Sequence, residues 1–167
     1  MENKSFATAY IQELEAEYTS TRKCLERIPE TVYNFKPHPK SMEMGYLTLL
    51  VAEIPLWVAI MVEEGEIDFV TFKHMDVRER EAVVRHYDEN IERAKAALQN
   101  ATEEDLAKEF RLKNKGELLY AQPMIAAVGS TINHWVHHRG QLTVYMRLND
   151  IAVPSIYGPS ADDKGFG

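Results

Sequence analysis

The length, composition and charge of the chain describe one soluble domain. It has 167 residues, of which 45% are hydrophobic and 27% are charged, so we expect a single globular domain over residues 1–167. A formal net charge of −7 counts against nucleic acid as a partner, because binding phosphates requires clustered lysine and arginine. The one cysteine, Cys24, excludes an internal disulfide and a thiolate zinc cluster and favours a reducing, cytoplasmic location. It is expected to pack as a small, unreactive hydrophobic side chain.

Apolar residues at helical spacing predict four long helices separated by short breaks. These helices cover residues 4–27, 42–64, 77–99 and 123–148. Pro29 and Gly65 end the first two, because proline interrupts a helix and glycine favours its C-terminal end. Asp76 with Glu79 has the pattern of a capping box for the third helix.

The connection between the third and fourth long helices is long and carries a short helix of its own. Thr102 caps this helix, which is expected to end near Phe110. Residues 111–120 are polar and contain Gly116, which predicts a loop or an irregular hairpin. The tail, residues 151–167, is expected to be irregular. The predicted fold is therefore all-α, a four-helix bundle with a long connection between helices three and four, and this connection could cover a site.

Residues 45–62 are apolar enough to be compared with a membrane span, which needs about 20 apolar residues. This segment is slightly shorter and lies mid-chain, and Glu53 and Pro55 stand at its centre. We therefore expect a helix buried at the centre of a bundle and no membrane partner.

Three histidines, His134, His137 and His138, lie close together in the fourth predicted helix. Residues four apart share one helix face, so His134 and His138 can direct imidazole nitrogens at one metal ion, whereas His137 points elsewhere. The spacing is similar to the H-E-x-x-H motif of zinc proteases, but Trp135 replaces the glutamate that serves as general base, which excludes a protease mechanism. A coincidental pair of histidines is the alternative to a metal site.

Glu53 is one charged residue in an otherwise apolar helix. A buried carboxylate must be paired, protonated or bound to a metal ion, since removing its charge from water is costly. The alternative is partial exposure near Pro55. Glu53 is thus a second position at which the sequence indicates site chemistry.

Four segments carry a resemblance to a known family. The longest is HHRGQLTVYMRLNDIAVPSIYGPSAD, residues 137–162, and the others are TRKCLERIPE, KPHPKSMEMGYL and VAEIPLW. Together they resemble the DinB-like family of bacterial metal-binding four-helix bundles, whose wider superfamily includes bacillithiol- and mycothiol-dependent transferases. The resemblance implies zinc or nickel between three histidines, one from the second helix and two from an H-x-x-x-H on the fourth.

Carried over to this sequence, the fourth-helix ligands are His134 and His138. The second-helix ligand position holds Leu50, which cannot bind a metal. Glu53, three residues further on a similar helix face, is the expected replacement and would complete a site of two histidines and one carboxylate. Because a shift of one turn moves a ligand by about 5 Å along the helix, two histidines alone are the alternative.

The resemblance implies two kinds of function. The first is a metal-dependent transferase or hydrolase, similar to the thiol S-transferases, in which Gln141 or Tyr145 orients a small-molecule substrate or thiol. The second is a non-catalytic relative that binds small molecules or acts as a stress-related oligomer. Its pocket would have an adaptable lining of methionines, namely Met42, Met44, Met61 and Met146. We expect a cytoplasmic homodimer in either case, and the net charge argues against a DNA-associated role.

Overall fold

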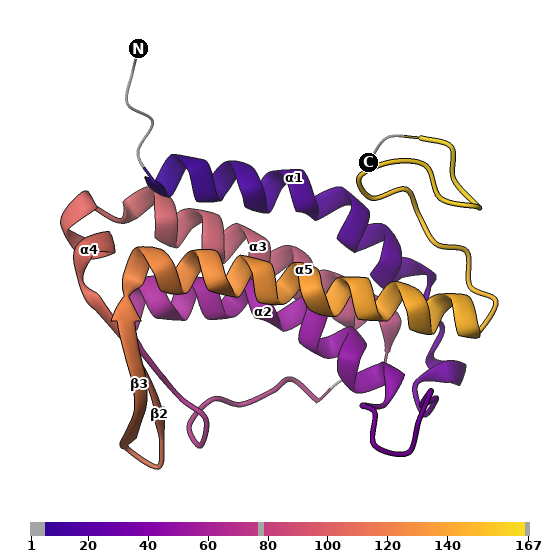
Figure 1. The fold of residues 1–167 in the computed structure, drawn as a ribbon, viewed down its shortest axis with the longest axis horizontal. Helices are drawn as coiled ribbons and strands as arrows, with labels where there is room; N and C mark the ends of the chain where they lie inside the picture. Colours follow the sequence, from indigo (N-terminus) through magenta and orange to yellow (C-terminus); the bar gives the residue numbers. More distant parts are fainter. Residues whose placement is uncertain (1–5, 77–78, 166–167) are drawn as a thin grey trace.

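Four long helices packed side by side dominate the computed structural model, which describes residues 6–76 and 79–165 (Figure 1). They are α1 (Phe6–Arg27), α2 (Met44–Glu64), α3 (Arg80–Asn100) and α5 (Met124–Leu148), with a single 3-10 turn, η1 (Glu30–Val32), after α1. Both α1 and α2 pack against α3 and α5. The predicted and observed boundaries differ by at most three residues, and predicted helix residues 4, 5, 77 and 78 lie outside the described part of the chain.

The helix α2 lies at the centre of the hydrophobic core. Its residues Leu47, Val51 and Ile54 are fully buried, since the helix has packed neighbours on both sides. Within the described ranges it is the one helix long and apolar enough to cross a membrane, and 67% of its most apolar window is buried inside the protein. Such burial is typical of the central helix of a globular fold, and it is compatible with a soluble protein.

A small sheet corrects the all-α prediction. The described residues include three strands, β1 (Glu66–Asp68), β2 (Glu109–Asn114) and β3 (Glu117–Pro123), and the short helix α4 (Glu103–Ala107). β1 pairs parallel with β2, and β2 pairs antiparallel with β3. The hairpin turns at Lys115 and Gly116, whose φ angles of 53° and 78° suit a two-residue turn, so the hairpin option for residues 111–120 is confirmed. The strand β1 escaped prediction because three residues cannot show alternation and its partner strand is distant in sequence.

The start of α3 corrects a second prediction. The helix begins at Arg80, and its N-cap residue Glu79 makes no capping hydrogen bond with its side chain, so the predicted capping box with Asp76 is wrong. Residues 77–78 lie outside the described part of the chain. The backbone N–H of Arg80 instead donates to Oε1 of Glu30 at 2.8 Å. A carboxylate from η1 thus occupies the position of a cap, which is a tertiary contact that sequence spacing cannot show.

The short helix α4 begins where the sequence predicts. The Thr102 hydroxyl accepts a hydrogen bond from the backbone N–H of Asp105, and the Asp105 carboxylate accepts one from the backbone N–H of Thr102. This reciprocal capping box confirms the predicted cap. The helix ends at Ala107, before the predicted end near Phe110, because Phe110 is a fully buried strand residue of β2.

The C-terminal residues 149–165 contain no helix or strand and return toward α1 (Figure 1). Arg139 of α5 holds them there, since its buried guanidinium pairs with the carboxylate of Glu17 on α1. The same guanidinium donates to the hydroxyls of Thr21 and Tyr157, each at 2.9 Å. The Tyr157 hydroxyl in turn donates to Glu17 at 3.0 Å. The network therefore connects α1, α5 and the tail through the buried ion pair between Arg139 and Glu17.

Candidate functional site

The predicted histidine pair lies on one face of α5. Nε2 of His134 is 2.8 Å from Nε2 of His138, so the helical spacing brings the two imidazoles together as expected. Nδ1–H of His138 donates to Oε1 of Gln141 at 2.8 Å. In a neutral imidazole, a protonated Nδ1 leaves Nε2 with a free lone pair. The Gln141 amide thus favours the tautomer in which Nε2 of His138 can accept a hydrogen bond or bind a metal ion.

The surroundings of the pair favour neutral imidazoles. Burial, followed by the charges of His138 and His137, lowers the pKa of His134 below its usual value. Burial also lowers the pKa of His138, against the opposing effect of its bond to Gln141. Metal ions bind the neutral ring, so at neutral pH both side chains are in the form that ligation requires.

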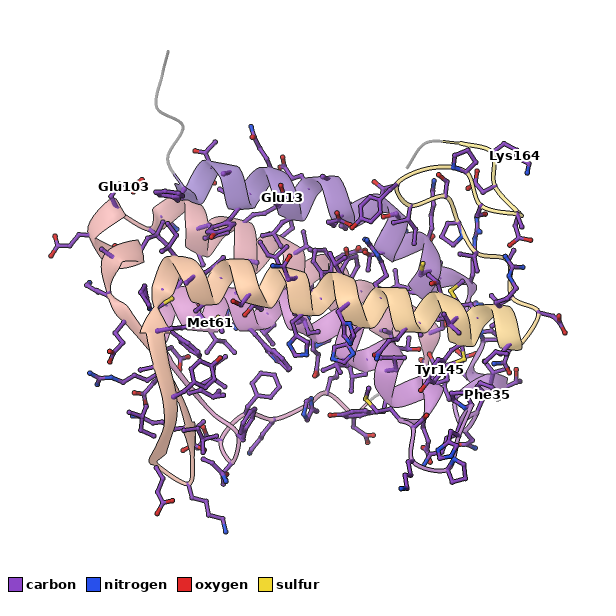
Figure 2. The ribbon with its side chains drawn as sticks, viewed as in Figure 1. Glu13, Phe35, Met61, Glu103, Tyr145 and Lys164 are labelled. Carbon is purple, nitrogen blue, oxygen red and sulfur yellow. The ribbon has the colours of Figure 1, made fainter. Side chains whose placement is uncertain are left out.

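A cavity of about 290 Å³ opens beside His134. Half of its wall residues are aromatic, and they come from α2, the loop after β1 and the hairpin: Tyr46, Trp57, Phe69, Phe72, Phe110 and Tyr120. The other wall residues are Met61, Ile67, His74, Leu112, Thr131 and His134. The ring of Trp57 lies 5.6 Å from that of His134 and 5.9 Å from that of Phe72, measured between centroids. Figure 2 shows rings gathered between the hairpin and the helices, near the labelled Met61, so a ligand there would contact one imidazole of the pair.

Glu53 is fully buried in α2, and its carboxylate is bonded to the loop that follows β1. Nδ1 of His74 lies 2.6 Å from Oε2 of Glu53, and the backbone N–H of Met75 donates to Oε1 at 2.8 Å. Nε2 of His86 lies 3.5 Å from Oε1, at the limit of a hydrogen bond. Burial raises the pKa of Glu53, but these three contacts, that of His86 first, outweigh burial and hold the pKa below its usual value. Glu53 is therefore a paired anion, one of the outcomes expected for a buried carboxylate.

The expected three-ligand metal set is not assembled in the structure. Within residues 6–76 and 79–165, no group of three His, Cys, Asp or Glu side chains is placed to hold a metal ion. Leu50 packs in the hydrophobic core, and the Glu53 carboxylate is directed to His74. In the part of the chain that the structure describes, the histidine pair on α5 and the carboxylate on α2 thus belong to two separate polar pairs.

The other predicted residues are divided between the site and the core. Gln141 supports the histidine pair, whereas the Tyr145 hydroxyl is engaged elsewhere and donates to the backbone carbonyl of Met42 at 3.2 Å. Among the four methionines expected to line a pocket, Met61 lines the cavity. Cys24 is fully buried, and burial raises the pKa of its thiol to about 11, in agreement with an unreactive side chain.

Sequence reasoning missed the contribution of the loop after β1. His74 lies beyond the end of α2 in sequence and is not among the predicted site residues, yet its ring lines the cavity and bonds to Glu53. The available signal was the run of rings at Phe69, Phe72 and His74 in a segment assigned to no helix. Exposed loops do not usually carry so many aromatic side chains unless these pack on something.

Long helices with a site between their facing surfaces are typical of helical bundles that bind a ligand or a metal. The DinB family model matches residues 1–164, and the chain belongs to the DinB family. The fold is similar to that of a DinB-like protein, YjoA, from Bacillus subtilis, with a TM-score of 0.69 and 21% identity over 93% of this chain and 99% of that chain. A DinB-like protein from Bacillus cereus ATCC 10987 matches with a TM-score of 0.67 and 21% identity, over 89% and 95% of the two chains. These two likenesses show the fold alone.

One curated relative is similar over a short segment. The uncharacterized protein YrdA of Bacillus subtilis strain 168 is 53% identical over 32 residues. This match spans 19% of the present chain and 19% of the relative, so it adds nothing on activity.

Proposed function

We propose that this chain is a metal-dependent transferase or hydrolase, similar to a thiol S-transferase, in which His134 and His138 hold zinc or nickel. The observation that carries the proposal is the 2.8 Å separation of the two Nε2 atoms, with Gln141 bonded to Nδ1 of His138. When bound, the ion would supply a Lewis acid that activates a thiol or a water molecule. The protein itself supplies the two ligands, their orientation and a place for the substrate.

The donor set fits a tetrahedral ion. Two nitrogens at the usual distance of about 2.0–2.1 Å from zinc stand about 3.3 Å apart, so a small rotation of the His134 and His138 rings would admit the ion. Gln141 makes the outer hydrogen bond that metal-binding histidines usually have. A tetrahedral ion with two protein ligands keeps open positions, which a catalytic site requires. Glu53 is left out of the set because its oxygens are bonded to His74 and Met75.

The cavity beside His134 supports a small-molecule substrate. Its wall is largely aromatic, and Trp57 packs against both His134 and Phe72. Apolar walls exclude water and strengthen the electrostatic interactions of a reacting group held within them. A substrate in this cavity would therefore contact the imidazole of His134 in a largely apolar environment.

A second candidate is a non-catalytic family member that binds a small molecule or acts as a stress-related oligomer. The observation that favours it is Leu50, which packs in the core at the position where the resemblance implies a third ligand. Under both proposals, we expect the protein to be a cytoplasmic homodimer.

The metal content of the protein tests the first proposal. Untagged protein would be purified without nickel resin, incubated with zinc and assayed by mass spectrometry of metals. We expect about one ion per chain, since the pair would hold a single tetrahedral ion. The ion should be lost in the double variant His134→Ala/His138→Ala and kept in His137→Ala, which removes only the neighbouring imidazole. No ion in the wild type, or an ion kept by the double variant, would contradict the proposal and favour the second candidate.

A further inference from the structure

The walls of the cavity beside His134 select the kind of ligand it can hold. Six aromatic side chains from α2, the loop after β1 and the hairpin line it. Aromatic rings offer stacked and edge-to-face contacts to another ring, which are worth more than buried area alone. No lysine or arginine is found among the described residues of the wall, so neither of these side chains offers an ion pair to an anionic ligand there. The wall therefore favours an uncharged aromatic ligand.

The volume of the cavity limits the size of that ligand. An engineered apolar cavity of about 150 Å³ takes up benzene. The present cavity, at about 290 Å³, is close to twice that volume. It would hold one molecule with one ring or two fused rings.

Among the polar side chains of the wall, His74 is held in position by a buried carboxylate. Its Nδ1–H donates to the buried carboxylate of Glu53 at 2.6 Å, which fixes the ring. In the tautomer with the proton on Nδ1, the other ring nitrogen, Nε2, is an acceptor. The side chain of His74 is 41% exposed, and the residue lines the cavity. The rings of Tyr46 and Phe72 also pack against this imidazole in T-shaped contacts, at 5.9 Å and 5.1 Å between centroids. By contrast, Nε2 of His134 already contacts His138.

We infer that the cavity binds a small uncharged aromatic molecule that carries one hydrogen-bond donor, and that His74, oriented by Glu53, accepts this hydrogen bond. The inference rests on the proposed function, because it names the substrate class of the same site. It also assigns a role to Glu53 that requires no metal ion. His134 would then contact the ligand from the α5 side of the cavity.

Two matched probes test the inference by calorimetry. Indole and benzofuran have the same fused-ring shape, but only indole has an N–H donor. We expect both to bind the wild type. In His74→Phe, which keeps an aromatic ring and removes the acceptor, the ratio of the two Kd values should shift toward benzofuran by about threefold to tenfold, the usual net effect of one hydrogen bond. Lys73→Ala, on the same loop but outside the cavity wall, should leave the ratio unchanged.

A second variant locates the probes. Leu112→Trp places a large ring in the cavity wall and should abolish binding of both probes. Binding of both that survives this change would overturn the cavity as the site. A ratio of Kd values unchanged in His74→Phe would overturn the role of His74.

Metal content, measured on the same samples, separates this inference from the proposed function. Zinc bound by the wild type without binding of either probe would overturn the ligand class and leave the metal proposal standing. Probe binding with the expected change in ratio, but without zinc, would support the ligand class and contradict the metal proposal.

Discussion

Two buried carboxylates, Glu17 and Glu53, lie in regions of opposite character. The partner of Glu17 is Arg139, which is 2% exposed and also bonded to Tyr157, so the network closes on itself between α1, α5 and the tail. The partner of Glu53 is His74, which is partly exposed and lines the aromatic cavity. A buried charge whose cationic partner is also buried acts on stability, whereas a buried charge whose partner reaches a cavity orients a group that a ligand can meet. We call the region around Glu17 the closed region, because Arg139 is buried. We call the region around Glu53 the open region, because His74 lines the cavity.

The largest effect is expected in the closed region. Arg139→Met would leave Glu17 buried without its cation, so the free energy of unfolding should fall by about 3–5 kcal/mol. Urea denaturation at pH 7 measures the change. The matched control is Arg147→Met, which removes an exposed ion pair with Asp162 and should cost at most about 1 kcal/mol. Equal losses in the two variants would show that the network around Arg139 is no more important than a surface contact.

The reactivity of Cys24 tests whether the same region excludes solvent. Its thiol is fully buried in α1, and burial raises its pKa to about 11 from an ordinary value of 9.0. The thiolate fraction at pH 8 should therefore be about 100-fold below that of a free thiol, since each pKa unit is a factor of ten. A colorimetric thiol reagent should react slowly with the folded protein and rapidly in urea. Equally fast reaction in both states would show that this part of the core opens readily.

At the histidine pair beside the open region, Gln141→Ala is expected to lower the affinity for a metal ion. The substitution removes the acceptor of Nδ1–H on His138 and frees the ring to change tautomer. Loss of such an outer hydrogen bond usually lowers metal affinity by about 10- to 100-fold. Zinc titration against a competing chelator measures the change, with Thr143→Ala on the same helix as a control. Unchanged affinity would mean that Gln141 does not position the ring.

A smaller effect is expected for Glu53→Gln, which should lower the free energy of unfolding by about 1 to 2 kcal/mol at pH 7. A neutral amide is a weaker acceptor than a carboxylate for the donors of His74 and Met75. Urea denaturation of the wild type and the variant measures the difference.

The pH dependence of the Glu53→Gln effect has a definite sign. The folded pKa of Glu53 lies below its ordinary value, so the carboxylate stabilises the fold above the unfolded pKa of about 4.3. This contribution is lost as the pH falls through the lower, folded pKa. The gap between wild type and variant should therefore shrink from pH 7 to pH 3. A gap of the same size at both pH values would contradict a paired anion at this position.

Local patterns predicted the elements of the molecule well. The boundaries of the four long helices follow from apolar spacing and from breaks such as Pro29 and Gly65. The cap at Thr102 needed only a residue three positions away. The meeting of His134 and His138 follows from one turn of helix in the same way. Each of these features depends on atoms within a few residues of one another, where helical geometry alone sets the distances.

Features that depend on distant partners could not be predicted. The carboxylate of Glu30 meets the N-terminus of α3 in place of the predicted capping box, and β1 forms only because β2 lies beside it. The environment of Glu53 is the clearest case. The sequence restricted this residue to a few outcomes, and only the packing of the loop after β1 placed His74 against its carboxylate.

The sequence by itself therefore determined the helices, the membership of the DinB family and the position of the histidine pair, because these are encoded in short-range spacing and in long matching segments. Only the tertiary structure decided which partner each buried charge received and where a cavity formed. Pairing across distant segments depends on how whole elements pack, and Glu53 and His74 come together because α2 and the loop after β1 share one side of the core.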